Sequence, residues 1–309
     1  MSEEKILKSM YERLESEGGK GKIVSINHVE DLKKELEKAY QSDLFDDEFY
    51  QKELTGFNFR TPEHNPDAKS LIVVAVPQPL IRVIFNLDGK PFPCLIPPNY
   101  NHKTDGRAKK ILESRLKQGG YHLKRARLPL KPLAVHSGLA QYGRNNISYV
   151  QGMGSFHRLV AFYSDFPCLE DNWGDLRIME RCDACRACQK ICPTDAIPSD
   201  RFLLRAERCI SFFSETQGEF PLWLEPSWHN CLVGCFLCQK VCPADKDFLE
   251  IIEEGPIFSP LETKFILQAK AKDEMSELTI EKLESLDIVE YIDVLGRNLR
   301  ALLDHSKKL

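Results

Sequence analysis

Two runs of cysteines in the second half of the chain limit its fold more than any other feature of the sequence. The first run has the spacing C-x2-C-x2-C-x3-C-P and ends at Cys192, and the second repeats the C-x2-C-x3-C-P ending from Cys235 to Cys242. In proteins with two iron–sulfur clusters, three thiolates of such a run bind one cluster, and the cysteine before proline binds the other. The paired runs therefore predict two [4Fe-4S] clusters and a role in electron transfer.

We expect the two clusters to exchange one ligand each, because both runs end in a cysteine that precedes proline. Cys192 would then serve the second cluster and Cys242 the first. The first cluster is predicted to use Cys182, Cys185, Cys188 and Cys242. The second is predicted to use Cys192, Cys235, Cys238 and one further cysteine.

The further ligand of the second cluster is the one ambiguous position. A cysteine three residues before Cys235 would complete the pattern, but that position is Leu232. Cys209 is the stronger candidate, because it follows the first run by a distance that a helix can span, and Cys231 is the alternative. We expect the cysteine that is left over to be a small, buried, apolar residue.

Zinc sites and disulfide bonds are the two other uses of cysteine to be weighed. Zinc sites of this kind usually take two C-x2-C pairs separated by a longer spacer, a pattern that three cysteines followed by Cys-Pro do not match. Disulfide frameworks are typical of short secreted chains, whereas this chain has 309 residues and shows no apolar signal segment. We therefore expect reduced cysteines and a cytoplasmic protein.

Composition indicates an ordinary globular protein with room for two domains. The chain is 42% hydrophobic and 28% charged, with a formal net charge of −4. No apolar stretch approaches the length of a membrane span, so no membrane partner is expected. The mild acidity argues against a dominant nucleic-acid surface.

The first half of the sequence alternates helix and strand patterns as an α/β domain does. An apolar run from Ser70 to Val76 predicts a strand that is buried on both faces. Helical spacing of apolar residues predicts helices over 3–17, 29–40 and 105–118. Further strands are expected over 22–26, 81–87, 92–96, 147–150 and 159–163, with Asp88-Gly89 as the turn of a hairpin.

We expect three segments along the chain and an α+β fold. Residues 1–175 are predicted to form a mixed α/β domain that holds a cofactor or substrate. Residues 176–248 are predicted to form a bacterial-ferredoxin-like domain with both clusters. Residues 249–309 are predicted to form a C-terminal helical segment.

Several short motifs give the chain a resemblance to a known family. The motifs are Gly138-Leu139, Gly143-Arg144-Asn145-Asn146, Thr194-Asp195-Ala196-Ile197 and Arg208-Cys209-Ile210-Ser211, together with the cysteine runs. Over roughly residues 65–248 this order resembles the epoxyqueuosine reductase family and its reductive-dehalogenase relatives. The resemblance implies a flavin-reductase-like α/β domain that carries cobalamin beside a double [4Fe-4S] domain. It also implies that Cys209 is the remaining cluster ligand.

One departure from the family pattern concerns the reaction. The family carries an aspartate, regarded as the proton donor, just before the segment that matches Leu133-Ala134. The corresponding stretch here, residues 123–127, contains no carboxylate. On this ground we expect epoxyqueuosine reductase activity to be doubtful and tRNA to be an unlikely partner.

Outside the cysteines, two polar segments are candidates to bind the cofactor. Their residues are Tyr100, His102, Tyr142, Arg144, Asn145 and Asn146. The first two follow a stiff Pro97-Pro98 approach to a loop, and the others follow glycines at which backbone can approach a ligand closely. Turn formation is the alternative role for the two asparagines. No catalytic residue is identified.

We interpret the chain as an iron–sulfur oxidoreductase that passes electrons through both clusters to a cofactor or substrate in the α/β domain. A corrinoid-dependent reductase is the first hypothesis. A reductase that uses flavin, and an electron carrier without its own substrate, are the alternatives. The expected donor is a redox protein such as a ferredoxin or flavodoxin, and the acceptor is a small molecule or a protein.

Overall fold

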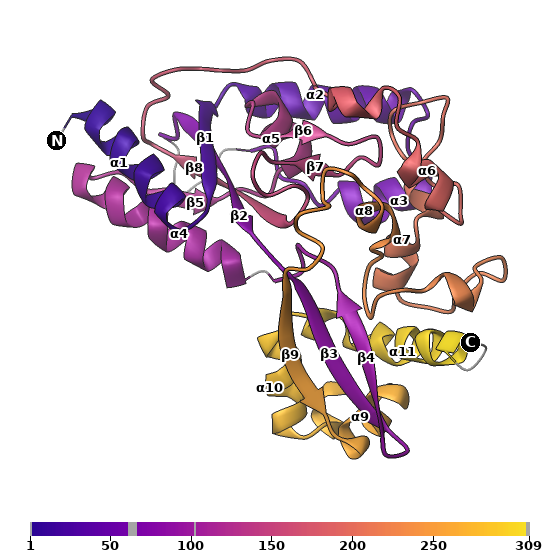
Figure 1. The fold of residues 1–309 in the computed structure, drawn as a ribbon. Coiled ribbons are helices and arrows are strands. Elements are labelled where there is room, and N and C mark those ends of the chain that lie inside the picture. Colours follow the sequence, from indigo (N-terminus) through magenta and orange to yellow (C-terminus); the bar gives the residue numbers. More distant parts are fainter. Residues whose placement is uncertain (1, 61–66, 102, 307–309) are drawn as a thin grey trace. The chain divides into compact units, whose positions relative to one another are not determined.

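The computed structural model describes residues 2–60, 67–101 and 103–306. It divides into two compact units, and each unit is built from two stretches of sequence (Figure 1). Unit 1 combines residues 1–77 with 102–185, and unit 2 combines residues 78–101 with 186–309. No helix among the described residues is both long enough and apolar enough to cross a membrane.

Unit 1 is organised around a four-stranded antiparallel sheet. The strand order is β1 (Lys20–Ser25), β2 (Ser70–Pro77), β8 (His157–Ser164) and β5 (Leu123–Arg125). Strand β2 is an almost continuous apolar run and β8 has one from Leu159 to Tyr163, and nearly all side chains of both strands are buried, as in strands that are covered on both faces. The expected strand at 70–76 is therefore confirmed.

Helices cover the sheet of unit 1. Helices α1 (Glu3–Ser16) and α4 (Lys103–Leu116) lie side by side and bury Met10, Leu14 and Leu112 against Val74 and Phe162 (Figure 1). Helix α5 (Leu130–His136) also packs on β2 and β8. The remaining elements are α2 (His28–Gln41), α3 (Asp47–Phe49), the π-helix η1 (Tyr50–Leu54), the 3-10 turn η2 (Lys117–Gly119), β6 (Gln141–Tyr142) and β7 (Ser148–Tyr149).

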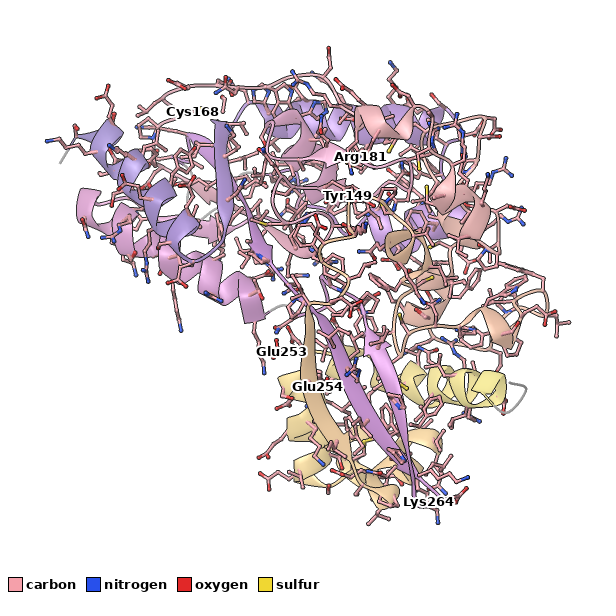
Figure 2. The ribbon with its side chains drawn as sticks, viewed as in Figure 1. Tyr149, Cys168, Arg181, Glu253, Glu254 and Lys264 are labelled. Carbon is pink, nitrogen blue, oxygen red and sulfur yellow. The ribbon has the colours of Figure 1, made fainter. Side chains whose placement is uncertain are left out.

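Unit 2 contains a separate three-stranded sheet with helices packed on it. The strand order is β4 (Lys90–Ile96), β3 (Leu80–Leu87) and β9 (Ile252–Phe258), and β3 pairs with β9 in parallel. Strand β9 carries Glu253 and Glu254 (Figure 2). Helices α9 (Pro260–Leu267), α10 (Glu277–Ser285) and α11 (Ile292–Ser306) also contribute to its apolar core, which includes Phe85, Phe258 and Leu295.

The cysteine-rich segment has only short helices. They are the 3-10 turns η3 (Glu180–Cys182), η4 (Ala206–Arg208) and η5 (Pro226–Trp228), and the helices α6 (Ala187–Ile191), α7 (Ile210–Glu215) and α8 (Leu237–Lys240). Helices α6 and α8 follow corresponding cysteines of the two runs and pack against each other. The α+β class that we expected is confirmed.

The structure divides the chain differently from the expected segments 1–175, 176–248 and 249–309. The β3–β4 hairpin forms around Asp88-Gly89 as predicted, but it pairs with β9 and so belongs to unit 2. We did not predict β9, because Gly255 and Pro256 interrupt its apolar pattern. The helices expected after residue 259 are present as α9, α10 and α11.

Candidate iron–sulfur centres

Cys182 and Cys185, the first two predicted ligands of the first run, lie at the end of unit 1. The segment before Cys182 is held beside β6, where the N–H of Tyr142 donates to Arg177 at 2.7 Å and the N–H of Met179 donates to Tyr142 at 2.9 Å. The N–H of Cys182 then donates to the carbonyl of Met179 at 2.8 Å and forms the turn η3. These backbone hydrogen bonds therefore fix the position of Cys182, the first predicted cluster ligand.

Arg144 connects this cysteine segment to the predicted cofactor loop, residues 142–146. Its Nη2 donates to the carbonyl oxygen of Cys182 at 2.6 Å. Both residues lie in unit 1, so this contact is internal to one compact body. Arg144 thereby links the predicted cofactor loop to Cys182, the first predicted cluster ligand.

The turn that carries Arg144 is fixed by its own hydrogen bonds. The N–H of Gly143 donates to Ile147 at 2.8 Å, and Nδ2 of Asn145 donates to the hydroxyl of Tyr149 at 3.1 Å (Figure 2). A side chain on Gly143 would collide with Asn145 and Tyr149, so glycine is required there. Asn146 has a φ of 57°, a backbone conformation that asparagine tolerates well. The amide of Asn145 thus supports the turn.

Tyr100, the other described candidate, lies in unit 2. Its hydroxyl donates to the carboxylate of Glu215 and sits against Gly234, the residue before Cys235. Burial, followed by the charge of Glu215, raises the pKa of this hydroxyl well above its ordinary value. His102 lies outside the described residues. The involvement of all six candidates with a cofactor stays a prediction.

Three of the predicted ligands of the second cluster gather in unit 2. Burial of its thiol raises the pKa of Cys235 to about 12, and the neighbouring Cys209 and Cys192 add to this shift. Burial also raises the pKa of Cys209, with a contribution from Cys192. When these three thiols are deprotonated, their negative charges repel one another. This repulsion acts only over a short distance, so the three sulfurs lie close together. Iron would relieve that repulsion, because it binds the deprotonated sulfur.

Cys231 has different surroundings. It is 2% exposed, and burial raises its pKa well above the ordinary value, with further contributions from Cys235 and Cys94. Its thiol donates to Oδ1 of Asn230 at 3.3 Å. Cys209 therefore interacts with Cys192 and Cys235, as a fourth ligand of the second cluster would, and its choice over Cys231 stays a prediction.

The donor set suits [4Fe-4S] clusters. None of the eleven cysteines, including the eight predicted ligands, forms a disulfide bond in the structure. Nowhere in the described part of the chain do three or more histidine, cysteine or acidic side chains converge closely enough to hold a single metal ion. Ligands of a [4Fe-4S] cluster have no need to converge in that way, because each thiolate binds a different iron atom.

Sequence reasoning missed two polar residues beside the second set of cysteines. Glu215 accepts from Tyr100 and adds to the raised pKa of Cys209. Asn230 donates from Nδ2 to Sγ of Cys235 at 3.2 Å. In the sequence, the one indication of this contact is that Asn230 lies only five residues before Cys235.

Comparison with known proteins supports the cluster assignment. The family model for the 4Fe-4S double cluster binding domain matches residues 181–245. An epoxyqueuosine reductase from Cyclobacterium marinum is 33% identical over 150 residues, which cover 48% of this chain and 46% of the relative. One from Escherichia coli is 35% identical over 131 residues, which cover 42% and 33%. The chain therefore spans less than half the length of these curated relatives.

Solved structures share the fold along nearly the whole chain. Epoxyqueuosine reductase from Streptococcus thermophilus has a TM-score of 0.66 at 18% identity, and the match covers 98% of this chain and 80% of that one. An epoxyqueuosine reductase with an epoxyqueuosine-modified tRNA-Tyr stem loop has a TM-score of 0.67 at 21% identity, with 99% and 83% covered. The resemblance to the epoxyqueuosine reductases is thereby confirmed.

Two expectations drawn from the missing carboxylate in residues 123–127 are wrong. We expected epoxyqueuosine reductase activity to be doubtful, but the curated proteins that match the chain carry that name. We expected tRNA to be an unlikely partner, but a structure of the same fold was solved with a tRNA stem loop.

Proposed function

We propose that this chain is an iron–sulfur reductase of the epoxyqueuosine reductase kind, and that it delivers electrons through two [4Fe-4S] clusters to an epoxide on a tRNA nucleoside. The hydrogen bond from Arg144 to Cys182 carries the proposal. It joins the loop predicted to meet a cofactor to the first ligand of a cluster, inside one unit. The names of the matching relatives supply the substrate class.

The electron count agrees with two clusters. Removal of an epoxide oxygen as water consumes two electrons and two protons, and a [4Fe-4S] cluster passes one electron at a time. The residues proposed to hold the first cluster are Cys182, Cys185, Cys188 and Cys242, and those proposed to hold the second are Cys192, Cys209, Cys235 and Cys238. The protein supplies the placement and the potentials of these cofactors.

Cobalamin is the further cofactor in this proposal. Tyr142, Arg144 and Asn146 of unit 1 are the residues proposed to contact it. They follow Gly138, which has open space beside its Cα. When bound, cobalamin would supply a strongly nucleophilic reduced cobalt. The role proposed for Arg144 is to keep the loop in place against the cysteine segment while its charge faces a polar group of the cofactor or substrate.

The test is turnover by the reconstituted protein. The chain is purified without oxygen, loaded with iron, sulfide and cobalamin, reduced, and incubated with tRNA that carries epoxyqueuosine. Mass spectrometry of the digested nucleosides should show loss of the epoxide oxygen, and Cys235→Ser should abolish this conversion. If protein with both clusters intact and reduced converts nothing, while the Escherichia coli enzyme converts the same tRNA, the proposal is overturned.

A further inference from the structure

The side-chain amide of Asn230 is held at both ends. Its Oδ1 accepts from the N–H of Phe236 at 2.8 Å and from the thiol of Cys231 at 3.3 Å. Its Nδ2 donates to the carbonyl of Trp228 at 3.1 Å and to Sγ of Cys235 at 3.2 Å. Four contacts on one short side chain leave it little freedom to rotate.

These partners also fix which end of the amide faces the sulfur. The N–H of Phe236 can only donate, so the group opposite it must be the carbonyl oxygen of Asn230. The carbonyl of Trp228 can only accept, so the group opposite it must be the NH2. A flipped amide would oppose donor to donor and acceptor to acceptor. Sγ of Cys235 therefore receives an N–H from Asn230.

Hydrogen bonds to the ligating sulfurs are among the factors that set the potential of an iron–sulfur cluster. A donor stabilises a sulfur more strongly when that sulfur carries more negative charge. Reduction adds an electron to the cluster and its ligands, so a donor favours the reduced form. We propose that Asn230 is a positioning residue that raises the reduction potential of the cluster bound by Cys235, with Cys231 and Phe236 orienting its amide.

This inference rests on the cluster binding in the proposed function, and it goes beyond the ligand set. It also gives Cys231 a place as a donor to Asn230 instead of an iron ligand. Cys235 is a predicted ligand whichever of Cys209 and Cys231 completes the second cluster. The contact of Asn230 with Cys235 therefore stands with either choice, and only the role of Cys231 as a donor depends on it.

The experiment compares reduction potentials in the anaerobic holoprotein without substrate. Wild type, Asn230→Leu and Asn230→Asp are titrated with a reductant while the electron paramagnetic resonance signal of each cluster is recorded. The signal of interest is the one that Cys235→Ser alters. In Asn230→Leu the equilibrium constant for reduction of this cluster should fall about tenfold, or about 59 mV for one electron. In Asn230→Asp it should fall further, because a carboxylate adds negative charge.

Gln189→Glu is the matched control. Gln189 follows Cys188 of the other cluster, and its amide donates to the carbonyl of Pro198 at 2.6 Å. The variant makes the same amide-to-carboxylate change beside a cysteine ligand without removing the donor to Cys235. It should leave the potential of the Cys235 cluster close to the wild-type value. A fall in Gln189→Glu equal to that in Asn230→Asp would mean that added charge alone explains the Asn230→Asp result, so that Asn230→Leu, which adds no charge, would decide the proposal.

A second measurement covers the case in which Asn230→Leu loses iron. Pulsed resonance of the reduced wild-type cluster in light and heavy water should detect exchangeable protons of both the Asn230 amide and the Leu237 N–H, which also donates to Cys235. Asn230→Asp should lose the Asn230 part of this coupling and keep the Leu237 part. Retention of the full wild-type coupling, or an unchanged potential in Asn230→Leu with full iron, overturns the inference. A shifted potential in a protein that converts no tRNA would refute the proposed function alone, and turnover with an unchanged potential would refute this inference alone.

Discussion

His136 and Glu35 form an ion pair in which Nε2 of the imidazole lies 2.8 Å from Oε2 of the carboxylate. The other nitrogen, Nδ1, donates to the carbonyl of Gly174 at 2.5 Å. The ring stacks on Trp173 with centroids 4.6 Å apart, and His28 stacks on the opposite indole face at 4.0 Å. These contacts hold Trp173 and Gly174, in the irregular segment before Cys182, against helix α2.

We predict that this contact stabilises the protein more at low pH than at high pH. Burial alone would lower the pKa of His136, but the hydrogen bonds to Glu35 and Gly174 outweigh it and raise the pKa. A raised pKa gives stability that is complete below the unfolded value of about 6.5 and is lost as pH rises through the folded value. Thermal unfolding is measured for wild type and Glu35→Gln from below the unfolded pKa to above the folded pKa of His136. The stability of the variant should depend less on pH across this range.

Glu37→Gln is the control for that experiment. Glu37 lies on the same helix and pairs with Lys33 in an exposed contact of 3.9 Å. Removal of its charge should leave the pH dependence as it is in wild type. A Glu35→Gln protein with the wild-type pH profile would contradict the role assigned to His136.

A second prediction concerns the buried carboxylate of Asp105. Arg158 binds it through Nε at 2.6 Å and Nη2 at 3.1 Å, and Arg125 also pairs with it. Both Asp105 and Arg158 are less than a tenth exposed. Asp105→Ala should lower the free energy of unfolding by about 3–5 kcal/mol, because it leaves Arg158 charged and buried without its partner. Chemical denaturation under anaerobic conditions measures this loss.

The exposed pair of Lys52 and Glu48 provides a comparison for Asp105. These side chains lie four residues apart with 2.6 Å between Nζ and Oε1, and both are largely exposed. Glu48→Ala should cost about 0.3–0.5 kcal/mol, as surface pairs at this spacing do. Equal losses in the two variants would show that the Asp105 pair behaves as a surface contact.

Strong local patterns explain what could be predicted from the sequence. The strand at Ser70–Pro77 is a continuous apolar run, and the β3–β4 hairpin turns at Asp88-Gly89, where both residues have positive φ. The cysteine spacing likewise predicts a double-cluster domain, as the family match at 181–245 confirms. Each of these signals is contained in a few consecutive residues.

What could not be predicted depends on contacts that appear only in three dimensions, some between distant parts of the chain and some between near neighbours. The hairpin joins unit 2 because Ile81 and Phe85 pair with residues of β9 that lie more than 150 positions later. The role of Asn230 depends on donors and acceptors from Trp228 to Phe236, whose directions appear only in three dimensions. No periodicity of apolar residues signals either relationship.

A third prediction identifies the fourth ligand of the second cluster. Cys209→Ser should lose or convert one cluster, because Cys209 neighbours both Cys192 and Cys235. Cys231→Ser should keep the full iron content, because Cys231 acts as a donor to Asn230. Iron and sulfide analysis of both anaerobic proteins measures this difference. The reverse pattern would transfer the ligand role to Cys231.

A fourth prediction tests the exchange of ligands between the runs. Cys242 precedes Pro243 at the end of the second run, so it should bind the cluster formed mainly by Cys182, Cys185 and Cys188. Electron paramagnetic resonance of Cys242→Ser should show that cluster altered and the other retained. Cys238→Ser is the control, because it should alter the other cluster. If both variants perturb the same cluster, the crossed arrangement is refuted.

The last prediction concerns Gly234, which has a φ of 73° and precedes the ligand Cys235. A left-handed backbone costs an ordinary residue about 1–2 kcal/mol. A side chain at this position would also collide with the phenol of Tyr100, which is hydrogen bonded to Glu215. Gly234→Ala should therefore lower stability by more than the backbone cost and reduce the iron content of the second cluster.

Gly218→Ala separates the two causes, because Gly218 also has a positive φ, 104°, but open space around its Cα. It should show a backbone cost without loss of iron. Tyr100→Phe removes the hydroxyl that a new side chain at Gly234 would meet, so adding it to Gly234→Ala should recover part of the lost iron. Equal iron contents in the two alanine variants, with no recovery in the double variant, would mean that Tyr100 does not constrain the loop that carries Cys235.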